Sequence, residues 1–399
     1  MSQPLSLALP AAGPKHGRML EMLAGRWRAL PVLIALAGIW IAFASLSDVF
    51  LSSHNLSNLS LQIVVTSVIS LSLVLVLLVG EIDLSVAYLS AVCAAIAAQL
   101  SVNFGWPFLF ALAGGVLAGA AWGLAQGFIT TRFRVPSFIV TLGGSLMLTA
   151  ALLKILPGEG QILLVRDPIG AIANSYLPDW LSYLGVAVAV LCVGLLRLQS
   201  HTQSRREGAA SSIARMVLVP SCVLGVAGAV IVALLGGYRG VPVAIAMLLV
   251  LLGFFSYLTR QTKFGTYIYA IGGNPEAARR AGIPVERVKI IVFMLTGALA
   301  AVGGIIAASR VLTVSTQALD PALLLEAIAA AVIGGASLFG GRGSVWAALT
   351  GALVMGSITN GLLLLNIPTA IRLEIQGAIL ILAVVTDAII AKQNPGPST

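Results

Sequence analysis

Residues 59–79, LSLQIVVTSVISLSLVLVLLV, carry no charged side chain over 21 positions. A helix needs ~20 mostly apolar residues to cross the hydrocarbon core of a bilayer, so this run predicts a membrane-spanning helix. Similar runs recur along the chain, which is 59% hydrophobic and 9% charged, against about 25% charged in soluble domains. The sequence therefore predicts an all-α polytopic membrane protein.

The apolar runs divide the chain into about 12 expected transmembrane helices, with about 10 as the alternative. Their expected positions are 29–46, 59–79, 84–100, 107–130, 137–156, 180–197, 216–236, 241–257, 290–308, 323–338, 345–366 and 371–390. Residues 1–28 then form an N-terminal segment, residues 29–390 the transmembrane domain with a cytoplasmic loop at 258–289, and residues 391–399 a C-terminal tail.

The basic residues predict the orientation in the bilayer, because they collect on the cytoplasmic side of membrane proteins. With the N-terminus inside, 18 of the 23 Lys and Arg side chains fall on the cytoplasmic side. The five on the other side are Lys154, Arg166, Arg239, Arg310 and Arg372. We therefore expect both termini in the cytoplasm, and we attribute the formal charge of +9 to topology, not to nucleic-acid binding.

The segment Gly80–Val86, between the second and third expected spans, is too short to clear the lipid headgroups. It holds Glu81 and Asp83 near the membrane boundary, where ionisable groups are costly and commonly functional. Asp83 and Ser85 can also satisfy the free backbone groups of a helix start. Two interpretations stay open: the segment lines a translocation path or gate, or it caps a helix.

Four glycines in the span 107–130 recur at a strict four-residue spacing: Gly115, Gly119, Gly123 and Gly127. On a helix this spacing forms one stripe, over which a second helix can approach closely. The stripe predicts helix packing, either within the chain or against a second copy of it.

Three polar features interrupt the apolar runs. Asn360 can hydrogen-bond a polar solute or bridge two helices, and both interpretations stay open. The loop 157–179 is expected to be a solvated connector outside the membrane. The glycine-rich turn 336–346 lacks the lysine of a phosphate-binding loop, since no Gly-Lys pair occurs in the chain.

Residues 266–289, TYIYAIGGNPEAARRAGIPVERVK, form a charged segment between long apolar runs. Its helix-start residues are Asn274, Pro275 and Glu276. Arg279 and Arg280 fall in the last turn of that helix, which Gly282 can end in the left-handed conformation. With Pro284 starting a second helix, we expect two short helices that form a rigid cytoplasmic projection. The alternative is an ordinary solvated loop.

The sequence does not support an enzymatic function. His16, His54 and His201 lie far apart in terminal or loop positions, so they do not predict a metal site. The acidic candidates fall near span ends, whereas a proton- or sodium-coupled carrier places ionisable residues mid-span. A self-powered secondary carrier therefore remains an alternative, but the less favoured one.

Four motifs resemble, in matching order, the permease subunits of bacterial sugar importers powered by ATP-binding cassettes, the ribose, xylose, arabinose and galactose group. The motifs are GEIDLSV at 80–86, PSFIVTLG at 136–143, NPEAARRAGI at 274–283 and IGGASLFGGRGS at 333–344. The resemblance covers roughly residues 55 to 390. Ala87 departs from it, since many relatives carry glycine there. The extra pair of spans around 180–236 is similar to the xylose-type permeases and favours xylose.

The resemblance implies a homodimer in the bacterial inner membrane, with two cytoplasmic ATPase subunits and a periplasmic sugar-binding protein that delivers a monosaccharide. ATP and magnesium would be bound by the ATPase subunits, and no cofactor is implied in this chain. Residues 274–282 would form the coupling segment, through which closure of the ATPases is transmitted. Its matching residues are Asn274, Pro275, Glu276, Ala277, Ala278, Arg279, Arg280 and Gly282.

Overall fold

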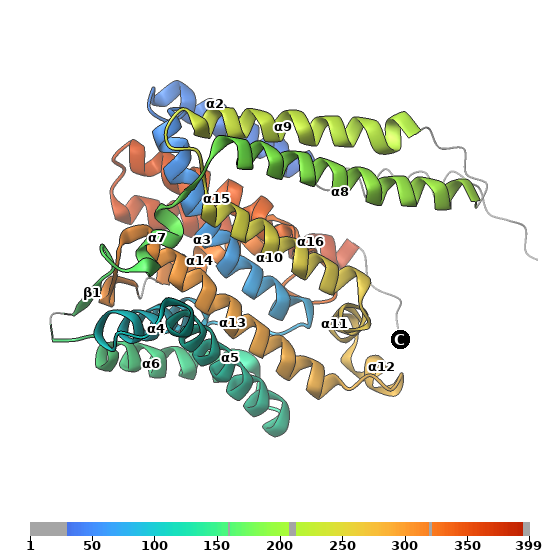
Figure 1. The fold of residues 1–399 in the computed structure, drawn as a ribbon. Coiled ribbons are helices and arrows are strands. Elements are labelled where there is room, and N and C mark those ends of the chain that lie inside the picture. Colours follow the sequence, from blue (N-terminus) through green and yellow to red (C-terminus); the bar gives the residue numbers. More distant parts are fainter. Residues whose placement is uncertain (1–29, 159, 207–212, 319–320, 394–399) are drawn as a thin grey trace, which may run out of the picture.

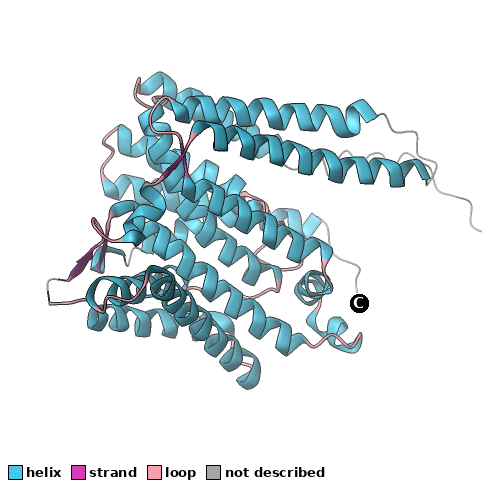
Figure 2. Cartoon of the chain, in the orientation of Figure 1, coloured by secondary structure: helices cyan, strands magenta, loops and turns pink. Residues whose placement is uncertain are grey.

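The computed structural model describes residues 30–158, 160–206, 213–318 and 321–393. These residues are almost entirely helical, and two small antiparallel two-stranded sheets join loops (Figure 2). The described part of the chain contains eleven helices that are long and apolar enough to cross a membrane, and α2 is a shorter apolar helix. The all-α polytopic fold is thus confirmed, whereas the total of twelve spans and the cytoplasmic termini stay predictions.

Every expected span has a helix at the corresponding position. These helices are α2 (Leu30–Leu46), α3 (Ser53–Leu78), α4 (Val86–Ala98), α5 (Phe108–Phe133), α6 (Ser137–Ile155), α8 (Asp179–Arg206), α9 (Val219–Gly236), α10 (Val243–Gln261), α13 (Val285–Val311), α14 (Pro321–Ile333), α15 (Ala347–Leu364) and α16 (Thr369–Gln393). A π-helical turn, Gln99–Asn103, extends α4. Three shorter helices lie between them, namely α7 (Pro168–Asn174), α11 (Lys263–Gly273) and α12 (Pro275–Arg280).

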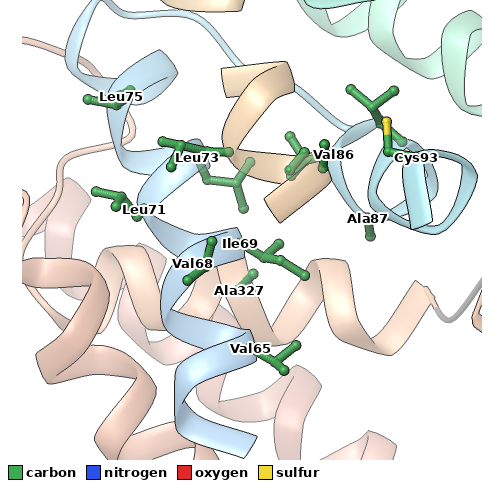
Figure 3. Packing of buried hydrophobic residues seen from close by; sticks show 14 of the residues in the cluster. Val65, Val68, Ile69, Leu71, Leu73, Leu75, Val86, Ala87, Cys93 and Ala327 are labelled. Carbon is green, nitrogen blue, oxygen red and sulfur yellow. The ribbon is translucent and has the colours of Figure 1, made fainter. Parts of the chain in front are cut away.

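Helix α3 runs through the centre of the bundle, where α13, α14 and α15 surround it. Its side chains Val68, Ile69 and Leu71 are fully buried, and Figure 3 shows them pointing to different sides of α3. Because lipid tails are as apolar as leucine, such packing is stabilised by van der Waals contact and not by exclusion from water. The second expected span, 59–79, therefore fills the core and does not face lipid.

The glycine stripe of α5 packs against α13 of the same chain, which answers the question that the sequence left open. A Cβ atom on Gly119 would lie 2.4 Å from the carbonyl oxygen of Gly297, and one on Gly123 would lie 2.1 Å from that of Phe293. Gly127 also lies against α13, at Ile290 and Phe293, whereas the backbone nearest to Gly115 is that of Cys93 in α4. The backbones of α5 and α13 are thus in direct contact.

Two groups of short elements occupy opposite ends of the bundle (Figure 1). At one end, β1 (Gln161–Leu163) pairs with β4 (Thr313–Ser315), and β2 (Tyr176–Leu177) pairs with β3 (Val241–Pro242). At the other end lie α11 and α12.

The expectation of a solvated connector at 157–179 holds only in part: more than half of its described residues are exposed, but others pack against the bundle. Ile162, Leu164 and Ile169 are almost completely buried. The Leu164 amide donates to the Leu312 carbonyl oxygen at 2.9 Å, so backbone pairing fixes this segment to the end of α13. Helix α7 packs on α13 as well.

Helices α8 and α9 form a hairpin at one side of the bundle (Figure 1). They pack mainly on each other, and only 6% and 11% of their apolar stretches are buried. This hairpin is the extra pair of helices expected around 180–236. Its low burial indicates that the hairpin contributes little to the packing of the other helices around α3 and α13.

The contact between α5 and α13 predicts opposite effects for two Gly→Ala changes. At Gly143 of α6, where a Cβ would meet nothing within 4 Å, alanine is expected to stabilise the helix by up to ~1 kcal/mol. At Gly119 the same change should destabilise by about 1–3 kcal/mol, because the backbones must separate. Melting midpoints of the detergent-purified variants measure both, and an unchanged midpoint in Gly119→Ala would contradict the close contact.

Candidate functional site

The charged segment folds largely as its sequence predicts. The Asn274 side chain accepts a hydrogen bond from the Ala277 amide at 3.0 Å and caps α12. Gly282 ends the turn with φ of +82°, and the Ile283 amide donates to the Ala278 carbonyl oxygen at 3.1 Å. These are the expected helix start and left-handed stop. Buried Ala278 anchors the short helix to its neighbours.

The expectation of two short helices is wrong for the second one. The helix that follows Pro284 is the first turn of α13, which continues without a break from Val285 to Val311. Since no helix-breaking residue follows Val285 and the polar Glu286, Arg287 and Lys289 are tolerated at a helix start, the membrane helix extends to the turn at Gly282. The projection is therefore a continuation of α13.

Arg279 and Arg280 differ in what they contact. Arg279 donates to Glu276 of α12 and to Glu286 of α13, each at 2.6 Å. These carboxylates raise the pKa of the Arg279 guanidinium, with Glu286 contributing most. Arg280 is exposed, and among the described residues it forms no ion pair. Arg279 thus holds α12 against α13, while Arg280 is available to a partner.

Two glycine turns and the C-terminal end of α11 meet next to α12, and we call their contact the glycine junction (Gly80, Gly272, Gly273, Gly340 and Gly341). A Cβ on Gly272 would lie 1.9 Å from the Leu78 carbonyl oxygen, and one on Gly340 would lie 2.8 Å from the Gly80 Cα. The Gly341 amide donates to the Leu78 carbonyl oxygen at 3.1 Å. The turns touch through their backbones, so the end of α3 is in contact with the charged segment.

The segment between α3 and α4 is tied to two further elements. The Lys289 ammonium of α13 forms an ion pair with the Glu81 carboxylate, and both side chains are only 15–16% exposed. The Ile82 amide donates to the Ser137 hydroxyl, and the Leu84 amide to the Thr141 hydroxyl, each at 3.1 Å. All four motifs that carry the resemblance therefore meet at this end of the molecule.

Asp83 and Ser85 satisfy the free polar groups of this segment. The Asp83 carboxylate, which is 1% exposed, accepts from the Ser85 amide at 2.8 Å and from its hydroxyl at 2.7 Å. Gln126 of α5 donates to the Ser85 hydroxyl at 3.0 Å. Burial raises the pKa of Asp83 to about 6, against the opposing effect of the Ser85 hydrogen bonds. These bonds satisfy the polar groups of the segment itself, but Ser85, the N-cap of α4, makes no side-chain bond to the first amides of that helix. Both interpretations, the path or gate and the helix cap, therefore stay predictions.

A cavity of about 490 Å³ with both polar and apolar lining residues lies at the other end of α13. Helices α3, α4, α13, α14, α15 and α16 line it. The Thr66 hydroxyl of α3 donates to Glu326 of α14 at 2.9 Å, and Gln376 of α16 donates to the Thr359 hydroxyl of α15 at 3.0 Å. The volume falls within the range of ~300–1,000 Å³ that is usual for small-molecule sites.

The residues predicted for the translocation path lie elsewhere. Glu81, Asp83, Ser85 and Asn360 are not among the described residues that line the cavity. Asn360 exchanges two amide hydrogen bonds with Asn55, of 3.0 and 3.1 Å, and so bridges α15 and α3. The prediction that these four line the path stays a prediction.

The cavity residues escaped sequence reasoning because single Thr, Gln and Glu side chains are scattered over separate spans. The one sequence feature that pointed to the cavity is that the polar residues Gln62 and Thr66 interrupt the apolar run 59–79. Only the packing of six helices brings them together with Glu326 and Gln376.

The described chain is a bundle of apolar helices with a solute-sized cavity at one end and a helical projection at the other. This arrangement is that of a polytopic membrane permease. The chain belongs to the permease family described as "Branched-chain amino acid transport system / permease component", which matches residues 55–384.

Relatives within this family are similar to nearly the whole chain. The xylose transport system permease protein XylH of Haemophilus influenzae is 36% identical over 362 residues, covering 89% of this chain and 95% of the relative. XylH of Escherichia coli K12 is 35% identical over 392 residues, 96% of each chain. The ribose import permease protein RbsC of the same strain is 30% identical over 360 residues, covering 89% of this chain and 92% of the relative. No solved structure matches the chain significantly.

The ion pair between Glu81 and Lys289 predicts a charge-swap rescue. Each single reversal, Glu81→Lys or Lys289→Glu, places like charges together at a mostly buried site and should cost up to ~3–5 kcal/mol. The double reversal should recover most of the lost melting midpoint in detergent. Glu276→Lys, which breaks an exposed pair, is the control with a smaller effect. A double variant no better than the singles would contradict a direct pairing.

Proposed function

We propose that this chain is the membrane-spanning permease subunit of an ATP-driven importer for a monosaccharide, a pentose such as xylose. The observation that carries the proposal is the identity of 35–36% with xylose permeases over nearly the full length of both chains. The extra α8–α9 hairpin agrees with the same subgroup. The chain itself is not an enzyme in this proposal, since ATP and magnesium are bound by the ATPase partner.

The proposed complex contains two copies of this chain, two cytoplasmic ATPase subunits and a periplasmic sugar-binding protein, in the bacterial inner membrane. Residues 274–282 are the proposed contact with the ATPase. Three features support this role: the capped α12 is rigid, Arg280 is exposed, and the glycine junction connects the segment to the end of α3. A displacement of α12 is therefore transmitted through backbone contacts and not through flexible side chains.

A self-powered sugar carrier is the alternative. It would work without a docked ATPase and would place ion-binding or proton-transferring groups along its path. The buried Glu326 beside the cavity is the feature that keeps this alternative open.

Co-purification separates the two functions. The tagged chain is extracted from its native membranes in mild detergent, and its partners are identified by mass spectrometry. We expect a P-loop ATPase in near-stoichiometric amount. Recovery of the chain alone, under conditions that keep other ATP-driven importers assembled, would favour the self-powered carrier.

Because Arg279 and Arg280 make different contacts, their reversal should affect ATPase association and thermal stability differently. Arg280→Glu should reduce ATPase association about tenfold, because a charge contact to the partner becomes repulsive, and should leave the melting midpoint unchanged. Arg279→Glu should lower both, because it also breaks the contacts to Glu276 and Glu286. Arg287→Glu, an exposed charge outside 274–282, is the control. Normal association in Arg280→Glu would place the docking contact elsewhere.

A further inference from the structure

We propose that the cavity at the end of α13 is the binding site where this chain holds a neutral sugar during transport. The inference rests on the proposed function and adds the residues that contact the solute. The polar part of its wall includes Gln62, Thr66, Glu326, Thr359 and Gln376. These residues come from four helices, so the site exists only in the packed bundle.

The wall offers the chemistry that a polyhydroxylated solute needs. Sugar hydroxyls both donate and accept hydrogen bonds, and the amides of Gln62 and Gln376 can do both as well. The carboxylate of Glu326 can accept from a hydroxyl in addition to its bond with Thr66, since its two oxygens offer about four acceptor positions. A hydrogen bond to a charged acceptor is stronger than one between neutral groups.

One part of the wall is formed by small apolar residues. Ala91 and Ala94 of α4 and Ala307 and Ala308 of α13 line the cavity. Their short side chains leave room for a ring and present apolar surface to its C–H groups. A cavity with one apolar side and a few placed polar groups is the usual form of a small-molecule site.

The charges of the wall favour an uncharged solute. Arg310, Arg372 and Glu326 line the cavity, but uncharged hydrogen-bonding side chains outnumber them. The Arg372 guanidinium donates to Thr369 at 2.8 Å, and its buried Nε–H has no hydrogen-bond partner among the described residues. A hydroxyl oxygen that entered the cavity could satisfy such a donor. A zwitterionic amino acid would need a cation and an anion in the wall that do not offset each other, whereas Glu326 interacts electrostatically with Arg310.

The position of the cavity connects it to the coupling segment. Helix α13 carries Lys289 at the glycine junction and Arg310 at the cavity, 21 residues apart in sequence, or ~30 Å along a helix. Helix α3 runs in the same way from Gln62 at the cavity to Leu78 at the glycine junction, 16 residues apart in sequence, or ~24 Å along a helix. Movement of α12 would thus displace two helices that form the cavity wall.

Uptake by the reconstituted complex tests the site. The chain, with its co-purified ATPase and binding protein, is placed in proteoliposomes, and ATP-driven uptake of radiolabelled D-xylose is measured. Thr66→Val and Gln376→Leu should each lower the uptake rate about tenfold and keep ATP hydrolysis. The control is Thr296→Val, a buried threonine of α13 that bonds the Ser72 carbonyl oxygen away from the cavity and should transport normally.

A labelling experiment gives an independent measure if a wall variant fails to assemble. Ala307→Cys is made in the chain with Cys93, Cys192 and Cys222 replaced, and its reaction with a small methanethiosulfonate is followed. Millimolar D-xylose should slow labelling at least twofold, and leucine should not. Protection by leucine alone, or wall variants that transport like Thr296→Val, would overturn the site. Absence of ATP-driven uptake in the unmodified complex would instead overturn the proposed function.

Discussion

The direct contact between the backbones of α5 and α13 is the constraint on which the rest of the structure depends. Gly119 and Gly297 face each other with no space for a side chain on either. Close approach of this kind maximises van der Waals contact, which is the main attraction between helices in lipid. It fixes α13, and through α13 it fixes both the coupling segment at one end and the cavity at the other.

Buried polar groups then determine where helices are allowed to begin and end. The interruption between α3 and α4 survives deep in the protein because Asp83, Ser137 and Thr141 bind its free amides. At the start of α3 the Ser52 hydroxyl accepts from the Asn55 amide, and the side-chain amides of Asn55 and Asn360 satisfy each other. Unsatisfied groups would be costly in a surrounding of low dielectric constant.

The same two helices reach both functional regions. Helices α3 and α13 meet the coupling segment through backbone contacts and the ion pair of Glu81 with Lys289. At their other ends they supply Gln62, Thr66 and Arg310 to the cavity wall. Rigid helices in contact at both ends provide a mechanical connection between an ATPase and a solute in the proposed importer.

The sequence by itself determined the properties that depend on local pattern. Apolar runs of membrane length predicted the all-α polytopic fold, and the capping residues Asn274 and Gly282 predicted the start and stop of α12. The ends of the helices were predicted less accurately, since α3 begins at Ser53 and not at residue 59. Tertiary partners satisfy the polar residues in its first turns, which a bilayer alone would exclude.

Tertiary structure alone decided which distant residues meet. The glycine spacing of α5 predicted a packing face, but only the fold shows that α13 of the same chain occupies it. The partial burial of the 157–179 segment depends on its pairing with β4, more than 130 residues away in sequence. The cavity likewise arises from single polar side chains on separate helices. Periodicity along one helix cannot reveal such a site, because it contains no information on which faces of different helices are opposed.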